Sequence, residues 1–217
     1  MRNVKRVLCI GKQATIKMST TKTNDSSALP SLIVFDLDDC LWTPEMHELS
    51  GMPEIPVFGK LDSKGTKGVV GLQVPRYKDT VTLHKGARKV LHEIATNPIY
   101  KDVQLATAST SLEPSYSYAC LGGIEILPGL SVGEMMSYNQ IGRTGILSSD
   151  KITHFRLLHE ESGIPYNEML FFDDCNWGDH CGRVSKKFGV VSQRTPHGLQ
   201  WKEFINALAK YKRNLLR

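Results

Sequence analysis

Aspartates occur in two close pairs whose side chains could share a divalent cation. Asp36 and Asp38 are two residues apart, so in an extended chain their side chains leave from the same side. Asp173 and Asp174 form the second pair, and we expect Asp174 to arrive beside the first. Three carboxylates within about 4 Å of one another repel by several kcal/mol unless one is protonated or a cation is bound. Because hard oxygen ligands suit Mg²⁺ better than Zn²⁺, we expect a Mg²⁺ site formed by Asp36, Asp38 and Asp174.

Hydroxyl and lysine side chains complete the chemistry of this expected site. Ser109 and Thr110 follow an apolar stretch, and Lys151 begins a predicted helix. Together with Mg²⁺, a lysine and hydroxyl groups suit a phosphoryl group, whose charge and oxygens they can hold. The chain has no Walker A loop and no GxGxxG, so nucleotide binding loses its usual support.

The polar clusters follow apolar runs that read as buried strands of a parallel sheet. These runs are continuously apolar, and helical patterns separate them along the chain. This order indicates an α/β, Rossmann-like parallel sheet with helices on both faces. Since ligands bind at the carboxyl ends of such strands, the clusters predict one site from distant parts of the chain. The alternative is that polar residues follow strands only because loops are polar. We expect strands at 32–35, 103–107, 169–172 and 189–192, and helices at 86–96, 113–121, 151–161, 178–187 and 201–211.

The positive charge of the chain is concentrated at its N-terminus. The net charge is +5, and residues 1–24 hold six basic residues and no acidic one. The remaining residues are nearly balanced, so we expect no nucleic-acid partner. No uninterrupted apolar run exceeds four residues, and we expect no membrane span. We therefore predict a disordered basic tail over 1–28 and one domain over 29–217, with a small cap or flap inserted at about 43–82.

The tail and the cysteines bear on the compartment. We expect a cytoplasmic protein. The tail over 1–28 is basic and rich in Ser and Thr, as transit peptides are, so a mitochondrial or plastid location is the alternative. The five cysteines form no CxxC pair, which is typical of reduced intracellular thiols. Cys40 and Cys175 each follow an aspartate cluster, so a redox pair near the site is a hypothesis beside that of two buried thiols.

The order of these motifs resembles that of the haloacid dehalogenase (HAD) superfamily. The matching stretches are Asp36-Leu37-Asp38-Asp39-Cys40, Ser109, Lys151 and Phe171-Phe172-Asp173-Asp174. Further stretches resemble the magnesium-dependent phosphatase 1 family within it: Leu41-Trp42, Lys151-Ile152-Thr153-His154-Phe155 and Gly163-Ile164-Pro165. The resemblance covers about residues 31–205.

The resemblance implies a phosphatase that works through an aspartyl-phosphate with Mg²⁺ as cofactor. Asp36 would be the nucleophile, and Asp38 would protonate the leaving group and then activate water. Ser109 and Thr110 would bind the phosphoryl oxygens, and Lys151 would balance charge. Asp174 would hold Mg²⁺ with the Asp36 carboxylate and the Asp38 backbone carbonyl. Asp173 would orient these groups without touching the ion.

Two residues depart from the families' usual pattern. Cys40 stands where many HAD phosphatases have Thr or Val, and Thr110 where the phosphatase 1 family usually has Arg. The second departure bears on substrate choice, which the 43–82 insertion could also decide. The resemblance implies an enzyme acting on phosphotyrosine or small phosphorylated metabolites such as sugar phosphates. We expect it to be a monomer.

Other function classes remain open. The fold could serve as a non-catalytic or regulatory phosphate-binding module, or as a HAD phosphotransferase. A receiver-type domain would place its acidic pair first in the chain, and a dehalogenase would need neither Asp38 nor Asp174, so both are less favoured.

Overall fold

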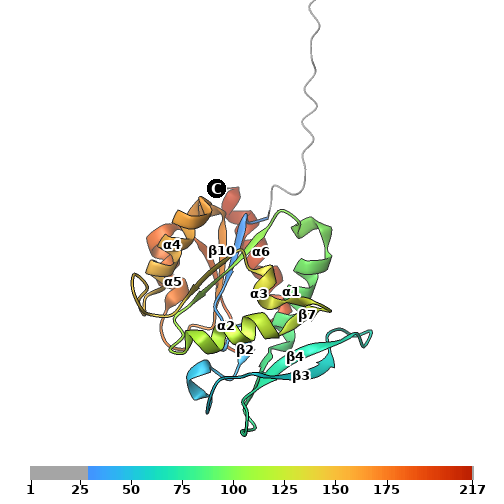
Figure 1. Cartoon of the computed structure of the whole chain (residues 1–217). Helices are drawn as coiled ribbons and strands as arrows, with labels where there is room; N and C mark the ends of the chain where they lie inside the picture. Colours follow the sequence, from blue (N-terminus) through green and yellow to red (C-terminus); the bar gives the residue numbers. More distant parts are fainter. Residues whose placement is uncertain (1–28, 217) are drawn as a thin grey trace, which may run out of the picture.

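The computed structural model describes residues 29–216 and centres on a parallel sheet of five strands in the order β11-β10-β1-β6-β9 (Figure 1). This arrangement confirms the predicted α/β fold. The strands are β1 (Leu32–Phe35), β6 (Gln104–Ser109), β9 (Tyr138–Ile141), β10 (Met169–Asp173) and β11 (Val191–Arg194).

The register of the central strands brings the predicted clusters to one edge of the sheet. All four residues of β1 are buried, as expected of an apolar strand covered on both faces. Phe35 lies opposite Phe172 on β10 and opposite Thr107 on β6. The residues that follow these positions therefore emerge at the same end of three neighbouring strands.

Helices cover both faces of the sheet and enclose two core clusters. Ile33 and Phe35 pack in the cluster that includes Phe204 of α6, whereas Leu32 and Val34 pack in the cluster that includes Phe155 of α4. Alternate residues of β1 thus face opposite layers. The first layer contains α1 (Lys85–Thr96), α2 (Pro114–Gly123), α3 (Val132–Met135) and α6 (Trp201–Leu215), and the second contains α4 (Lys151–Ser162) and α5 (His180–Phe188).

Both ends of α4 are defined by local sequence. Asp150 caps the first turn, where its Oδ1 accepts a hydrogen bond from the Ile152 N–H at 3.1 Å. Gly163 ends the helix in the left-handed region, with φ of 68°. This start places Lys151 at the helix N-terminus and His154 one turn later on the same face.

The predicted insertion is a second, antiparallel sheet in the order β2-β5-β4-β3. It lies in the lower part of Figure 1, where β4 contacts α2 and β7. Arg88 of α1 joins it to the domain, because its Nη1 donates to the Glu125 carbonyl at 2.7 Å and its Nη2 to the Val70 carbonyl at 3.1 Å. The strands are β2 (Trp42–Thr43), β3 (Ile55–Lys60), β4 (Lys67–Gln73) and β5 (Thr80–Leu83), with a 3-10 turn η2 at Met46–Glu48.

Several short elements lie outside the sequence prediction. The edge strand β9 has the polar sequence Tyr-Asn-Gln-Ile, which carries no strand periodicity. Strand β11 begins two residues later than expected because Gly189 adopts φ of 77° and ends α5 there. The other unpredicted elements are β7 (Glu125–Leu127), β8 (Leu130–Ser131), α3, and the 3-10 turns η3 (Pro98–Tyr100) and η4 (Tyr166–Glu168).

Two further predictions concern the N-terminal tail and membrane-spanning helices. The predicted tail over 1–28 lies outside the described residues. Among residues 29–216, no helix has the length and hydropathy needed to cross a bilayer.

Candidate active site

A cavity of about 470 Å³ opens at the carboxyl ends of β1, β6 and β10. Its position agrees with the rule that parallel sheets bind ligands at this edge. The structure thus brings residues from four distant parts of the sequence to one place. The predicted residues that line the cavity are Asp36, Asp38, Ser109, Thr110, Lys151 and Asp174, whereas Asp173 is not part of the lining.

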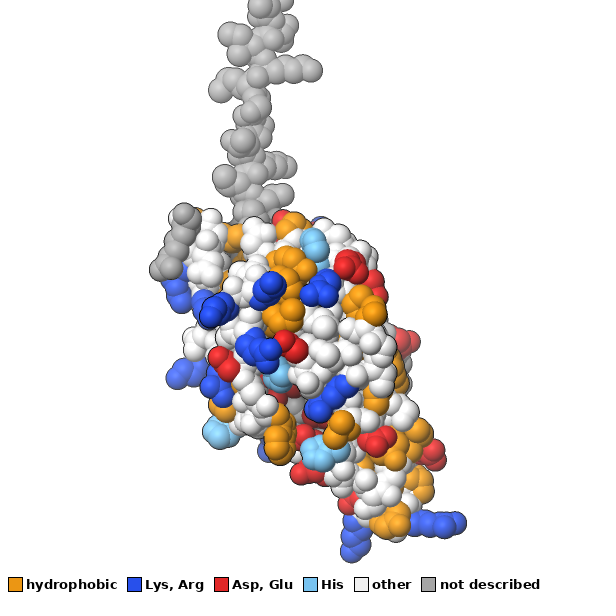
Figure 2. All heavy atoms as spheres, turned by 90° about the vertical axis from the view of Figure 1, so that its left-hand side faces the viewer, with side chains coloured by type: hydrophobic (Ala, Val, Ile, Leu, Met, Phe, Trp, Pro, Cys, Tyr) orange, Lys and Arg blue, Asp and Glu red, His pale blue; other side chains and the backbone are white. Residues whose placement is uncertain are grey.

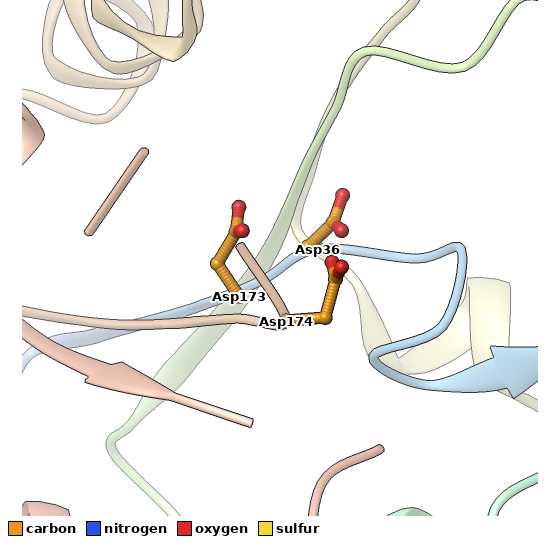
Figure 3. A group of neighbouring side chains, drawn as sticks. All are labelled: Asp36, Asp173 and Asp174. Atoms are coloured by element: carbon orange, nitrogen blue, oxygen red, sulfur yellow. The ribbon is translucent and has the colours of Figure 1, made fainter. Parts of the chain in front are cut away.

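Three carboxylates lie close together beside this cavity (Figure 3), and two of them, those of Asp36 and Asp174, line it. Asp36 follows β1, and Asp173 and Asp174 lie at the end of β10. Each offers one oxygen, and these oxygens lie within 4.8 Å of one another. The group differs from the expected one, because Asp173 belongs to it and the Asp38 carboxylate does not. All three side chains are buried and offer only oxygen atoms as ligands. Oxygen ligands are those that a hard divalent cation such as Mg²⁺ prefers.

Lys151 bridges two of these carboxylates from the start of α4. Its Nζ lies 2.6 Å from Asp36 Oδ1 and also donates to Asp173 Oδ2. Asp173 is fixed in turn by the Cys175 N–H, which donates to its Oδ1 at 2.7 Å. Asp173 therefore holds Lys151 from behind the cavity, while Lys151 itself faces into it.

The charges of this cluster are strongly perturbed. Burial raises the pKa of Asp36 well above its usual range; Lys151 opposes this rise, whereas Asp173 and Asp174 add to it. For Asp173, burial acts in the same upward direction, but the neighbouring Lys151 charge brings its pKa below the usual value. Asp36 thus sits in a surplus of buried negative charge, and a bound cation would relieve it.

Asp38 lines the cavity, but its carboxylate is hydrogen-bonded to Trp42 and is not part of the three-carboxylate group. The Trp42 Nε1–H donates to Asp38 Oδ1 at 2.8 Å. Burial raises the pKa of Asp38 to about 6, an effect that the hydrogen bonds from Trp42 and from the Met46 N–H reduce. A carboxyl group with a pKa near neutrality can both give and accept a proton, as a general acid and base must.

Ser109 and Thr110 form a further part of the cavity wall. Ser109 is buried, and its Oγ accepts a hydrogen bond from the Ser111 N–H at 3.3 Å. Within residues 29–216 its hydroxyl hydrogen has no acceptor, so it is available to a ligand in the cavity. The Thr110 carbonyl accepts a hydrogen bond from Arg143 Nε at 2.5 Å.

His154 is fully buried behind this wall. Its Nε2 lies 3.0 Å from the Ser109 carbonyl and 3.1 Å from the Gly142 carbonyl. Since both partners are acceptors, Nε2 must carry the hydrogen. His154 thereby ties the end of β6 to the end of β9.

The rim of the cavity contains residues that the sequence analysis did not assign to the site. Trp177 is largely exposed, and its Nε1 donates to Glu45 Oε1 at 2.8 Å across the rim. Trp177 could have been found by extending the strand-end rule past Asp174, whereas nothing in the sequence marks Glu45. The unassigned lining side chains with charged or aromatic groups are Glu45, His47, Arg143, Trp177, Asp179, His180 and Arg183.

The insertion covers the cavity less than expected. Of residues 43–82, only Glu45 and His47 line it, and the strands β3 to β5 do not. If the insertion influences substrate choice, it would therefore do so through the residues in and next to the 3-10 turn η2.

The two cysteines of the redox hypothesis lie in different core clusters. Cys40 belongs to the cluster that includes Phe35, and Cys175 to the cluster that includes Val34 on the opposite face of the sheet. Cys175 instead neighbours Cys181, whose N–H lies 3.4 Å from Cys175 Sγ. The structure gives no support to a Cys40–Cys175 pair.

The surface in Figure 2 shows Lys and Arg interspersed with Asp and Glu, rather than gathered into one basic area. On the described part of this face, the charge pattern differs from the continuous basic stripe typical of nucleic-acid binding.

Comparisons with known proteins agree with this geometry. The family model described as Acid Phosphatase matches residues 28–214. The chain is also 28% identical over 145 residues to a HAD-like hydrolase superfamily protein of Schizosaccharomyces pombe, which covers 67% of this chain and 76% of that protein. The resemblance to HAD-superfamily phosphatases is thereby confirmed.

A solved structure from Bacteroides fragilis shares the fold. It is the N-terminal part of a protein containing a phosphatase domain, complexed with Mg, and it matches with a TM-score of 0.53 and 14% identity. The match covers 84% of this chain, which spans only 40% of that chain.

Proposed function

The chain belongs to the Acid Phosphatase family, among the HAD-like hydrolases, and on this basis we propose that it is a Mg²⁺-dependent phosphomonoesterase. In this proposal the reaction passes through an aspartyl-phosphate on Asp36. The observation that carries it is the position of Asp36, whose carboxylate contacts Lys151, lies beside Asp174 and faces a cavity that Ser109 also lines.

The first step forms the covalent intermediate. An Asp36 oxygen attacks phosphorus as the bond to the ester oxygen breaks, and Asp38 gives its proton to the departing alkoxide. The Ser109 hydroxyl donates to a phosphoryl oxygen, and Lys151 offsets the negative charge that gathers there.

The second step releases phosphate. The Asp38 carboxylate, now deprotonated, takes a proton from a water molecule whose oxygen attacks phosphorus. The bond between phosphorus and the Asp36 oxygen breaks, which restores the Asp36 carboxylate and leaves Asp38 protonated for the next cycle. A pKa of about 6 for Asp38 suits this alternation.

Asp36 and Asp174 would hold the Mg²⁺ ion, together with the Asp38 backbone carbonyl. The buried, oxygen-only carboxylate group supports this assignment, and the B. fragilis structure is complexed with Mg. When bound, the ion would neutralise charge on the phosphoryl oxygens.

We further propose membership of the magnesium-dependent phosphatase 1 family, with phosphotyrosine or small phosphorylated metabolites as substrates. The stretch from Lys151 to Phe155 supports this by its resemblance to that family, and two of its residues lie at the site: Lys151 contacts Asp36, and His154 contacts the Ser109 carbonyl.

Hydrolysis of para-nitrophenyl phosphate tests the proposal. We expect activity with Mg²⁺, its loss with a chelator, and its loss in Asp36→Asn. Asp39→Asn is the matched control, because Asp39 lies outside the cavity lining and its φ of 54° is one that Asn tolerates. Activity that survives chelation or Asp36→Asn would refute the mechanism.

A further inference from the structure

Arg143 holds an exposed guanidinium at the cavity rim. It follows β9 and lines the cavity beside Thr110. Its Nε donates to the Thr110 carbonyl at 2.5 Å, so one of its five N–H donors is used. The two terminal nitrogens keep the fork that binds carboxylate or phosphate through two hydrogen bonds.

The backbone around Arg143 is fixed relative to the wall that carries Ser109. The Gly142 N–H donates to the Ser109 carbonyl at 2.9 Å, and His154 Nε2 contacts the carbonyls of both residues. Arg143 is therefore attached to a backbone anchor rather than to a free loop tip.

The charge of Arg143 is not compensated by a carboxylate. Of the other Lys and Arg residues in the lining, Lys151 is paired with two buried carboxylates and Arg183 with Asp150. In the described residues, Arg143 has no ion-pair partner, and its hydrogen bond goes to a neutral carbonyl. It is thus the one Lys or Arg of the described lining that has no carboxylate partner.

We propose that Arg143 binds a second anionic group of the substrate, so that the preferred substrates are phosphate monoesters that also carry a carboxylate or another phosphate. This deepens the proposed function and rests on it. In the proposed function the transferred phosphoryl group has the buried side chains of Lys151 and Ser109 as its own partners, whereas Arg143 is exposed at the rim.

Matched esters test this preference. We compare two esters with an anionic para substituent, 4-carboxyphenyl phosphate and 1,4-phenylene bisphosphate, with 4-carbamoylphenyl phosphate, called the neutral ester because its para substituent is uncharged. Each is assayed with the wild type, Arg143→Ala, Arg143→Lys and the control Arg156→Ala. Arg156 is exposed on α4 and does not line the cavity. Comparing the carboxylate ester with the bisphosphate shows which of the two anionic groups Arg143 binds.

We expect the wild type to have a kcat/KM roughly fivefold higher for an anionic ester than for the neutral one, as an exposed ion pair of about 1 kcal/mol would give. Arg143→Ala should remove this preference by raising KM for the anionic ester alone, with kcat and the neutral ester unchanged. Arg143→Lys should keep part of the preference, and Arg156→Ala all of it.

Three results would overturn the proposal. The first is equal kcat/KM for all esters in the wild type. The second is an equal loss on charged and neutral esters in Arg143→Ala, which would place Arg143 on the transferred phosphoryl group. The third is loss of the preference in Arg156→Ala.

Binding of non-hydrolysable phosphonates separates this proposal from the proposed function. Calorimetry compares (4-carboxybenzyl)phosphonate with its carboxamide. A wild type that hydrolyses no ester, yet binds the carboxylate more tightly through Arg143, would refute the phosphatase and retain the anion subsite. Equal or absent binding of both phosphonates would overturn the subsite even if hydrolysis is observed.

Discussion

His154 should make the stability of the domain depend on pH. Burial lowers the pKa of His154 to about 4, with the Lys151 charge acting in the same direction and the carbonyls of Ser109 and Gly142 opposing it. The ring is therefore neutral, with its hydrogen on Nε2 between the two carbonyls. In the unfolded chain the same ring has a pKa of about 6.5.

The sign follows from which state binds the proton first. As the pH falls below about 6.5, the unfolded chain takes up a proton at His154 while the folded chain does not. The stabilisation is fully present above about pH 6.5 and is lost as the pH falls to about 4. A difference of about 2.5 pH units corresponds to about 3 kcal/mol at 1.36 kcal/mol per unit. This is a large part of the 5–15 kcal/mol that typically stabilises a domain.

Urea unfolding at a series of pH values measures this effect. His154→Gln cannot titrate and keeps an N–H that can donate to one carbonyl, at a cost of about 1–3 kcal/mol near pH 7. Between about pH 7 and pH 4, the wild type should lose about 3 kcal/mol more than the variant. His92→Gln, the same exchange on α1, should keep the wild-type slope because His154 is intact. Equal slopes in the wild type and His154→Gln would refute the reasoning.

Two further substitutions test other parts of the account by urea unfolding. Lys151→Met leaves two buried carboxylates without their partner and should lower the free energy of unfolding by about 3–5 kcal/mol. The control Lys186→Met, on the exposed side of α5, should change it by no more than about 0.5 kcal/mol. A loss below about 1 kcal/mol for Lys151→Met would contradict the bridging role. Gly163→Ala should cost about 1 kcal/mol. Its φ is 68°, and apart from its chain neighbours no atom of residues 29–216 lies within 4 Å of the added methyl group, so backbone conformation alone opposes the change. Gly122→Ala, equally open but inside α2, should stabilise by roughly 0.5–1 kcal/mol, and the same sign for both glycines would contradict this explanation.

The carboxyl ends of β1 and β10 could be predicted because their signal is local. Four buried apolar residues followed directly by aspartates mark both the strand and the place where it ends. The parallel arrangement then brings Asp36 and Asp174 together without any knowledge of side-chain partners.

The orientation of individual side chains could not be predicted in the same way. Asp38 has the spacing to join Asp36, but the Trp42 indole lies within hydrogen-bond distance of it after the chain turns back. Asp173 contacts Lys151 because the N-terminus of α4 lies beside β10, and this is a tertiary contact. Spacing along a strand fixes the side from which a side chain leaves, but not its partner.

Arg143 illustrates a third limit. It follows β9, a polar edge strand that pairs with β6 from Ala106 to Ser109. Because the strand itself has no apolar pattern, the sequence does not show that Arg143 arrives next to Thr110. The rim of the site therefore depends on elements that tertiary pairing stabilises.

The covalent intermediate on Asp36 is the most direct test of the central claim. The enzyme is mixed with Mg²⁺ and para-nitrophenyl phosphate and quenched with borohydride, which reduces an acyl phosphate to the alcohol, and its peptides are analysed by mass spectrometry. The account predicts homoserine at position 36, dependent on both Mg²⁺ and substrate. An unreduced Asp36 during turnover, or reduction at a different aspartate, would contradict it.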